Sequence, residues 1–168
     1  MSINLKSELS VWFSHFIKYI PGILGCRLRA KLLKFKGLGK DVKIWDNTHI
    51  EFSKKLVIGD RVSINRGCNI NCAGGLFIGD DVLIGPYVTI YTQNHNYLDR
   101  KRKINQQGFY HDKVVIENDV WIAANVTILP GVVLSEGCVI GAGSIVTSST
   151  EPYCLYVGSP ARKIKGRY

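Results

Sequence analysis

The residue best suited to chemistry in this sequence is His95, which stands in the run NHNY at residues 94–97. An imidazole gains and loses a proton near neutral pH. A base held within hydrogen-bond reach of a reacting hydroxyl contributes about 10² to 10⁴-fold in rate. The other histidines, His15, His49 and His111, lack a comparable setting. His95 is therefore the candidate general base.

The sequence offers little for metal or thiol chemistry. Only His95 and His111 lie close enough in the chain to be considered together as metal ligands, and we expect no metal. The five cysteines form no CxxC pair and are odd in number, which argues against a zinc finger and a disulfide framework. Cys68 and Cys138 instead fall at a position of a six-residue repeat, described below, where small inward-facing side chains recur. This favours a packing role for both. A reducing cytoplasm fits this usage best.

A repeat of six residues predicts the fold. Aliphatic residues recur at every sixth position in three registers, separated by a two-residue slip and by a longer interruption. The registers are Ile58, Ile64, Ile70 and Leu76; Ile78, Ile84 and Ile90; and Ile116, Ile122, Ile128, Leu134, Ile140 and Val146. A period of six suits a short strand followed by a corner, so three sides make one triangular coil. Stacked coils bury the aliphatic column, which predicts a mainly β, parallel β-helix.

The longer interruption marks a loop that leaves the prism. The register of Ile90 predicts its next member at position 96, but the pattern resumes at Ile116, so 116 − 96 gives a 20-residue insertion over about 96–115. Loops of this length within regular architecture are often functional. His95 therefore sits where a loop joins a rigid scaffold.

The N-terminal part has a different organisation. Residues 3–35 carry apolar side chains at three- and four-residue spacings, which predict an amphipathic helix, broken at Pro21 and Gly22 and followed by a second segment. We expect a basic helical segment at 1–41 and a β-helix domain at 42–168.

Charge is concentrated in this N-terminal part. Of the net charge of +9, residues 1–40 hold +7, from eight Lys or Arg against Glu8. The helices could cap the end of the prism, or the basic segment could contact a membrane surface. No apolar run approaches the roughly 18 to 20 residues that span a bilayer, and no secretory signal pattern is evident. The chain is therefore expected to be cytoplasmic, with peripheral contact at the inner membrane as a possibility.

Three runs carry a family resemblance: VWIAANVTILPGV at 120–132, IGAGSIVT at 140–147 and VGSPAR at 157–162. They closely resemble hexapeptide-repeat acetyltransferases of the galactoside, maltose and polysaccharide type, over about residues 42–166. The resemblance implies a left-handed parallel β-helix, a homotrimer with active sites between neighbouring prisms, and acetyl-CoA as cosubstrate. It also implies that His95 removes the proton of an acceptor hydroxyl as that oxygen attacks the thioester carbonyl.

The same resemblance, taken residue by residue, implies a coenzyme A site. It places Trp121, Ala124, Ala142 and Thr147 along the groove for the pantetheine arm and adenine, and Arg162 and Lys165 as cations facing phosphate. For Ala142 and Thr147, a purely structural role at a corner of the coil is an equally good interpretation. Ala123 departs from the glycine that is commoner in the family after the Trp-Ile pair, which leaves the detail of the donor site open.

For the acceptor, the resemblance points to Asn65, Asn69 and Asn71, which either bind sugar hydroxyls or cap turns. Tyr97 lies beside the cationic run RKRK at 100–103, which could hold an acidic or lipid-diphosphate-linked glycan or remain solvated. The group that orients His95 is open between Asp99, Asp112 and a backbone carbonyl.

The resulting interpretation is an acetyl-CoA-dependent O-acetyltransferase acting on a sugar or polysaccharide-precursor hydroxyl of the O-antigen, capsule or exopolysaccharide type. N-acetylation of an amino sugar, free or nucleotide-linked, is an alternative because the same base and groove would serve either nucleophile. A non-catalytic trimeric scaffold at the membrane surface is a second alternative. Nucleic acid is not an expected partner, because the sequence has no recognised nucleic-acid module.

Overall fold

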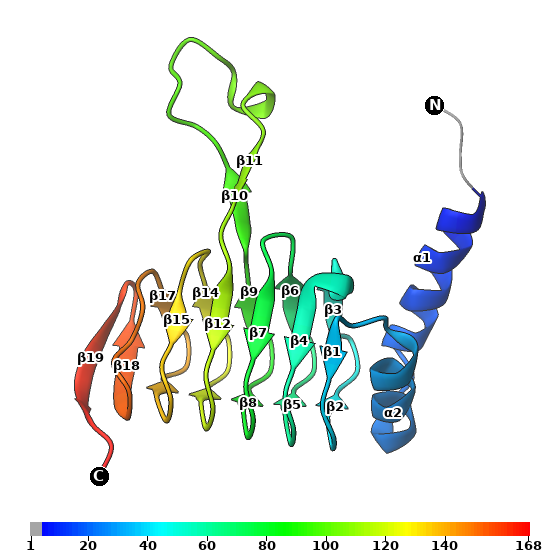
Figure 1. Ribbon diagram of the computed structural model, residues 1–168, viewed down its shortest axis with the longest axis horizontal. Helices are drawn as coiled ribbons and strands as arrows, with labels where there is room; N and C mark the ends of the chain where they lie inside the picture. The colour runs from blue at the N-terminus through cyan, green and yellow to red at the C-terminus, as the bar shows by residue number, and fades with distance from the viewer. Residues whose placement is uncertain (1–4) are drawn as a thin grey trace.

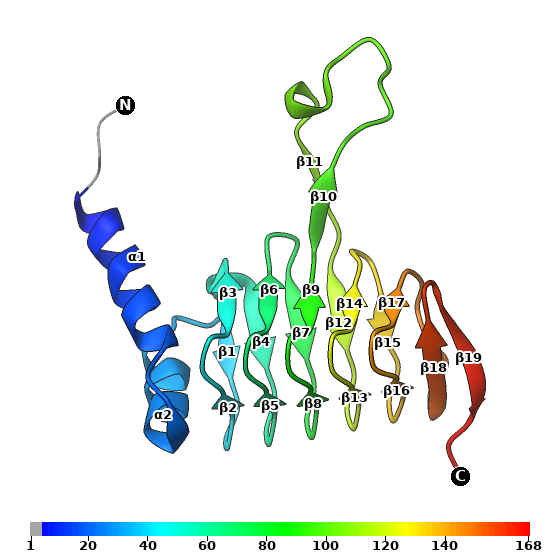
Figure 2. The same ribbon diagram turned by 180° about the vertical axis from the view of Figure 1, so that it is seen from behind.

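The computed structural model describes residues 5–168, apart from the side chains of Lys6, Ser7, Ser10 and Ser14. The first four residues of the expected helical segment 1–41 thus lie outside the described residues. Two helices, α1 (Leu5–Lys18) and α2 (Gly22–Leu32), stand at one end of a three-sided prism of short strands. A long hairpin rises from the middle of the prism (Figures 1 and 2).

Each side of the prism is one parallel sheet, except that on the second face the last strand, β19, pairs antiparallel with β18. The first face contains β1 (Gly37–Leu38), β4 (Leu56–Ile58), β7 (Leu76–Ile78), β12 (Val114–Ile116) and β15 (Val133–Leu134). The second contains β2 (Lys43–Ile44), β5 (Ser63–Ile64), β8 (Leu83–Ile84), β13 (Trp121–Ile122), β16 (Val139–Ile140), β18 (Cys154–Gly158) and β19 (Ala161–Gly166). The third contains β3 (His49–Glu51), β6 (Asn69–Asn71), β9 (Thr89–Ile90), β14 (Thr127–Ile128) and β17 (Ile145–Val146).

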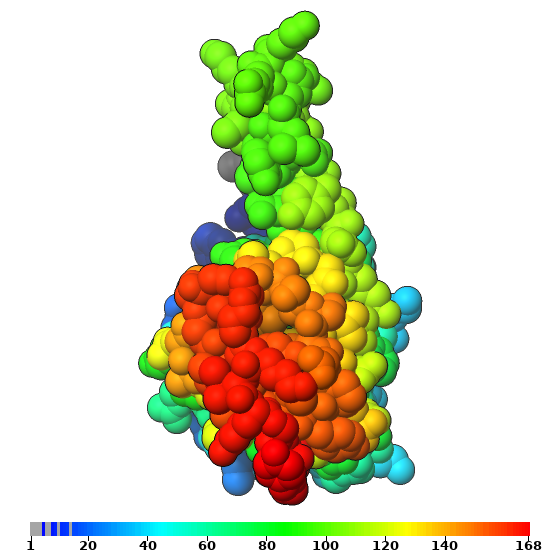
Figure 3. All heavy atoms as spheres, turned by 90° about the vertical axis from the view of Figure 1, so that its left-hand side faces the viewer, coloured from blue at the N-terminus to red at the C-terminus, as the bar shows by residue number. Residues whose placement is uncertain are grey.

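The hairpin is formed by β10 (Gln93–His95) and β11 (Phe109–His111), which pair antiparallel. Two short 3-10 turns complete the fold, η1 (Ser53–Lys55) in the first coils and η2 (Ile104–Gln106) in the hairpin loop. Viewed along the prism from its C-terminal end, the hairpin projects from one corner (Figure 3).

The core is the predicted aliphatic column. Ile122 pairs with Ile84 on one side and Ile140 on the other, and all three are buried. Every member of the three hexad registers is at most 2% exposed. The predicted parallel β-helix with helices at its N-terminus is confirmed. Among residues 5–168, no helix is both long enough and apolar enough to cross a membrane.

A buried arginine fixes the helices to the first coil. Arg29 of α2 is only 1% exposed, and its guanidinium donates hydrogen bonds to the carbonyls of Ile17 (2.9 Å) and Ile20 (2.7 Å) at the end of α1. It also donates to the Ile44 carbonyl in β2 (2.7 Å). Carbonyls at a helix C-terminus lack intrahelical partners, and a cation there is also favoured by the helix dipole. Arg29 therefore belongs to the core rather than to a basic surface.

The cysteines give a first testable consequence of this core. All five are buried, and loss of hydration on burial raises the pKa of Cys68 to about 11 and of Cys72 to about 12. Since the thiolate is the reactive form, about one Cys72 thiol in 10⁴ would be ionised at pH 8. We expect negligible reaction of the native protein with a disulfide reagent such as DTNB, and five reactive thiols after unfolding in guanidinium. A thiol that reacts in the native state as fast as free cysteine would contradict this packing.

Candidate active site

The hairpin that carries His95 is anchored to the neighbouring coil through Thr92. This side chain is fully buried between β9 and β10. Its hydroxyl donates a hydrogen bond to the Asn71 carbonyl (2.9 Å) and accepts one from the Gly74 N–H (2.8 Å). The Thr92 carbonyl accepts the N–H of Asp112 on the returning strand (2.9 Å). Both legs of the hairpin are thereby tied to one point of the rigid prism.

The His95 imidazole is exposed and lies against an aromatic ring. His95 and Phe109 are cross-strand neighbours in the hairpin, with ring centroids 4.2 Å apart and planes tilted by 36°. Within residues 5–168, no carboxylate lies within ion-pair distance of the imidazole, and the Asp99 carboxylate instead accepts the Lys101 N–H at 2.9 Å. The structure thus gives the ring an aromatic support that the sequence reasoning did not identify.

His95 lines two hollows. The prism-side hollow has about 320 Å³ and is lined by Tyr91, Gln93, Asn94, His95, Phe109, Leu129 and Pro130. The loop-side hollow has about 540 Å³ and is lined by His95, Asn96, Tyr97, Leu98, Asp99, Arg102, Gln107 and Tyr110. His95 therefore contributes both to a space beside the rigid coils and to a space along the loop. Of the predicted acceptor residues, Tyr97 shares the loop-side hollow with His95.

The loop is held in shape by Gln107. Its side-chain N–H groups donate to the carbonyls of Asp99 and Arg102, both at 2.9 Å, and its Oε1 accepts the Asp99 N–H at 3.1 Å. The Asn96 side chain donates to the Gln107 carbonyl at 3.1 Å. These four bonds brace the part of the loop that presents Tyr97 and the cationic run.

The predicted asparagines are placed apart from these hollows. Asn71 is 5% exposed, and its amide donates to Glu51 Oε2 (2.6 Å) while its Oδ1 accepts the Ala73 N–H (3.0 Å). Asn65 accepts the N–H of Arg66 at 2.8 Å, as a turn cap does. Asn69 is exposed on the third face. None of the three lines either hollow at His95.

The predicted coenzyme residues lie partly in one row. On the second face, strand pairing aligns Leu83, Trp121, Val139, Leu155 and Lys165 across five neighbouring strands. Trp121 and Lys165 are exposed at two points of this row, with the apolar Val139 and Leu155 between them. Arg162 lies on the same strand as Lys165, is exposed, and donates to the Ala161 carbonyl at 2.9 Å. An apolar row that ends near two cations fits a ligand with an apolar arm and phosphates.

The remaining predicted coenzyme residues lie on two edges of the prism. Ala124 and Ala142 are neighbours on the edge between the second and third faces, where the Gly143 N–H donates to the Ala124 carbonyl at 2.9 Å. Thr147 follows β17 on the edge from which the hairpin departs, one coil beyond Leu129 of the prism-side hollow. Among the coenzyme candidates, Thr147 thus lies on the edge of the prism from which the hairpin with His95 departs.

The anchoring by Thr92 leads to a second prediction. Thr92→Val keeps the shape of the side chain but removes the hydroxyl, which leaves the Gly74 N–H and the Asn71 carbonyl without their partner. Because the hairpin then loses a fixed base, we expect turnover to fall by about tenfold or more with the affinity for the coenzyme unchanged. Kinetics and calorimetry on Thr92→Val, with Thr92→Ser as the conservative control, test this. A variant with unaltered turnover would show that the anchor does not position His95.

Comparisons with known proteins agree with this fold. The family model of the bacterial transferase hexapeptide (six repeats) matches residues 113–148. The galactoside O-acetyltransferase of Escherichia coli is 33% identical over 139 residues, which are 82% of this chain and 68% of that protein. A solved hexapeptide-repeat acetyltransferase of Vibrio cholerae, in complex with acetyl coenzyme A, has a TM-score of 0.83 and 32% identity over 92% of this chain and 83% of that one. The chain belongs to the hexapeptide-repeat acetyltransferase family.

Family members differ in length. A probable acetyltransferase of Mycobacterium tuberculosis is 34% identical over 131 residues, and the chain spans only 44% of its length. The chain therefore spans less than half of that protein.

Proposed function

We propose that this chain is an acetyl-CoA-dependent O-acetyltransferase that acetylates a hydroxyl of a sugar or of a polysaccharide precursor. The observation that carries the proposal is His95 on an anchored hairpin, where it lines two hollows. A base that lines two spaces can face a donor in one and an acceptor in the other. Membership of the hexapeptide-repeat acetyltransferase family supports acetyl transfer as the reaction.

The residues of the chain would have the following roles in the reaction. His95 accepts the proton of the acceptor hydroxyl, which is too weakly acidic to ionise unaided, and so makes its oxygen a competent nucleophile. Phe109 restricts the tilt of the imidazole, and Thr92 and Gln107 fix the hairpin and the loop. Tyr97 and Arg102 line the loop-side hollow, which would receive the acceptor.

Acetyl-CoA, when bound, would supply the thioester carbonyl that the acceptor oxygen attacks, and breaking the C–S bond would release the coenzyme thiolate, which takes up the proton held by His95. The residues that would hold it are Trp121, Ala124, Ala142 and Thr147 along the prism, with Arg162 and Lys165 facing phosphate groups. The apolar row of the second face and the two cations on β19 support this assignment.

We further propose that the chain acts as a homotrimer in the cytoplasm, in peripheral contact with the inner membrane. The hairpin leaves the prism at one edge, whereas Arg162 and Lys165 lie on the second face. A neighbouring prism would supply the second wall of a site shared between these two regions. Light scattering that gives a monomer of about 18.8 kDa at micromolar concentration would contradict the trimer.

The assay that tests the function measures free thiol released from acetyl-CoA in the presence of candidate acceptors. Acetate on oxygen is removed by mild alkali, whereas acetate on nitrogen is not, so the product separates O-acetylation from the N-acetylation of an amino sugar. A non-catalytic scaffold would show neither coenzyme binding by calorimetry nor thiol release. The proposal fails if acetyl-CoA does not bind.

A third prediction concerns the coenzyme phosphates. Arg162→Ala should weaken acetyl-CoA binding by about 1.5 to 3 kcal/mol, the value of a hydrogen bond to a charged group. Lys163→Ala is the matched control, since Lys163 lies on the same strand but is paired with Glu151 at 2.6 Å. The thermal melt of the Arg162 variant should barely move, because the side chain is exposed. Equal affinities for the two variants would show that Arg162 does not face phosphate.

A further inference from the structure

Helix α1 presents an apolar surface that nothing in the described chain covers. Leu5, Leu9, Trp12 and Phe16 follow one another at spacings of four, three and four residues, which places them on one side of a helix. We call these four residues the α1 stripe. Trp12 is 70% and Phe16 71% exposed. Large exposed apolar patches on a protein surface mark interaction sites.

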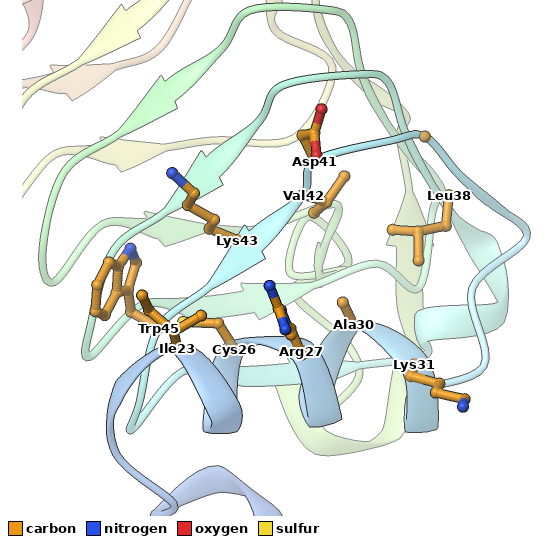
Figure 4. A pocket seen from close by; sticks show the side chains of 11 residues that line it. Ile23, Cys26, Arg27, Ala30, Lys31, Leu38, Asp41, Val42, Lys43 and Trp45 are labelled. Atoms are coloured by element: carbon orange, nitrogen blue, oxygen red, sulfur yellow. The ribbon is translucent and has the colours of Figure 1, made fainter.

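A second apolar surface adjoins α2. A hollow of about 620 Å³ lies between this helix and the first coil (Figure 4). Its apolar lining includes Ile23, Leu38, Val42 and Trp45, and its charged lining consists of Arg27, Lys31, Lys43 and Asp41. In Figure 4 the Arg27 side chain lies in the middle of the lining residues, with Lys43 and Lys31 toward opposite sides. Apolar surface bordered by more cations than anions suits an anionic amphiphile.

The charge of the segment points the same way. Residues 1–40 contain eight Lys or Arg and one acidic residue, Glu8, for a net +7, and +6 remains when the buried Arg29 is left out. From α2, Arg29 binds the carbonyls of Ile17 in α1 and Ile44 in β2, so the two helices and the first coil are held together at one end of the molecule.

We propose that α1, α2 and the adjoining hollow form a docking surface for an anionic lipid bilayer. The α1 stripe lies among the acyl chains at the interface, and the cations of α2 and the first coil contact the headgroups. A helix of 14 residues is about 21 Å long, shorter than the roughly 30 Å hydrocarbon core, so α1 lies along the surface. Trp12 and Tyr19 are of the residue types enriched at such interfaces.

Charge favours this occupant over a second copy of the chain. Pairing of two copies through the α1 stripe would bring two basic segments together, and like charges at close range repel. An anionic surface instead attracts each cation.

The lipid surface and the active-site hairpin are separate parts of the molecule. Helix α2 and its hollow lie at the side of the prism away from the β10–β11 hairpin (Figures 1 and 2). The docking surface therefore rests on the proposed peripheral membrane contact, to which it gives named residues, and not on the proposed acetyl transfer.

The experiment is flotation of the full chain with vesicles of phosphatidylcholine alone and of phosphatidylcholine with about 30% phosphatidylglycerol, at low and high salt. We expect binding to the anionic vesicles that weakens with salt. The double variant Trp12→Ser/Phe16→Ser should lower the partition coefficient by about tenfold or more, since two large apolar side chains no longer insert. Arg27→Gln/Lys31→Gln should reduce the salt-dependent part of the binding.

Val11→Ser is the matched control for the stripe. Val11 is 61% exposed on α1 but lies about 130° around the helix from the stripe, and the variant should bind vesicles as the wild type does. Equal losses in the control and the double variant, or no binding by the wild type, would overturn the proposal. A lower oligomer mass of Trp12→Ser/Phe16→Ser in light scattering would also overturn it, because the stripe would then be a subunit contact. Acetyl-CoA binding measured on the same variants without vesicles reports separately on the proposed function.

Discussion

Replacement of His95 by alanine should lower kcat by about 10² to 10⁴-fold while acetyl-CoA binding and the oligomeric state stay unchanged. The imidazole is exposed, so its removal disturbs little packing, and the prism core lies elsewhere. What is lost is the group that accepts the acceptor's proton beside the two hollows. Kinetics at saturating donor, calorimetry and light scattering measure the three quantities.

His111→Ala provides the control for this prediction. His111 is also exposed and also lies on the hairpin, opposite Gln93 at its base. It lines neither of the two hollows, so its variant should turn over nearly as fast as the wild type. If His95→Ala kept more than about a tenth of the wild-type rate on the true acceptor, His95 would not be the base. A large loss in His111→Ala instead would transfer the role to that residue.

The fold could be predicted in detail because its signal is local and repeated. The hexads repeatedly place an aliphatic side chain inward. An atypical residue in one hexad therefore does not hide the pattern, because the neighbouring hexads still show it. Even the two-residue slip between Leu76 and Ile78 has a simple cause. Both side chains are buried, because strands of the first face such as β4, β7 and β12 have three residues and turn both ends inward.

The environment of the candidate site was less accessible from the sequence. The position of His95 followed from the register break, but its neighbour Phe109 is brought to it by the pairing of a hairpin inside an insertion without periodicity. The anchor Thr92 looks like an ordinary polar residue until both of its hydrogen-bond partners are known. Arg29 is another such residue, since its charge suggests exposure and only three-dimensional contact with α1 reveals its burial. Contacts between distant segments carry this information, and a local pattern does not.

The inward positions of the repeat lead to the last prediction, a comparison of two isoleucines on adjacent strands of the third face. Ile128 on β14 is fully buried, whereas Ile145 on β17 points outward and is 36% exposed. Ile128→Ala should lower the free energy of unfolding by about 2 to 5 kcal/mol, because a cavity remains in a core that is packed on all three sides. Ile145→Ala removes the same atoms from a half-exposed position and should cost less than about 1 kcal/mol.

Denaturant unfolding at one fixed protein concentration gives both values, since stability depends on concentration if the chain associates. The two variants should differ both in the denaturant concentration at the midpoint of unfolding and in the free energy of unfolding extrapolated to water. The slope of the free energy against denaturant should be the same for both. Neighbouring coils share the aliphatic column, so the loss of side-chain atoms at Ile128 should also weaken the packing of Ile90 and Val146, its partners in register. Equal losses for the two isoleucines would mean that burial on this face does not follow the six-residue register, and the prism as described could not then be the folded state.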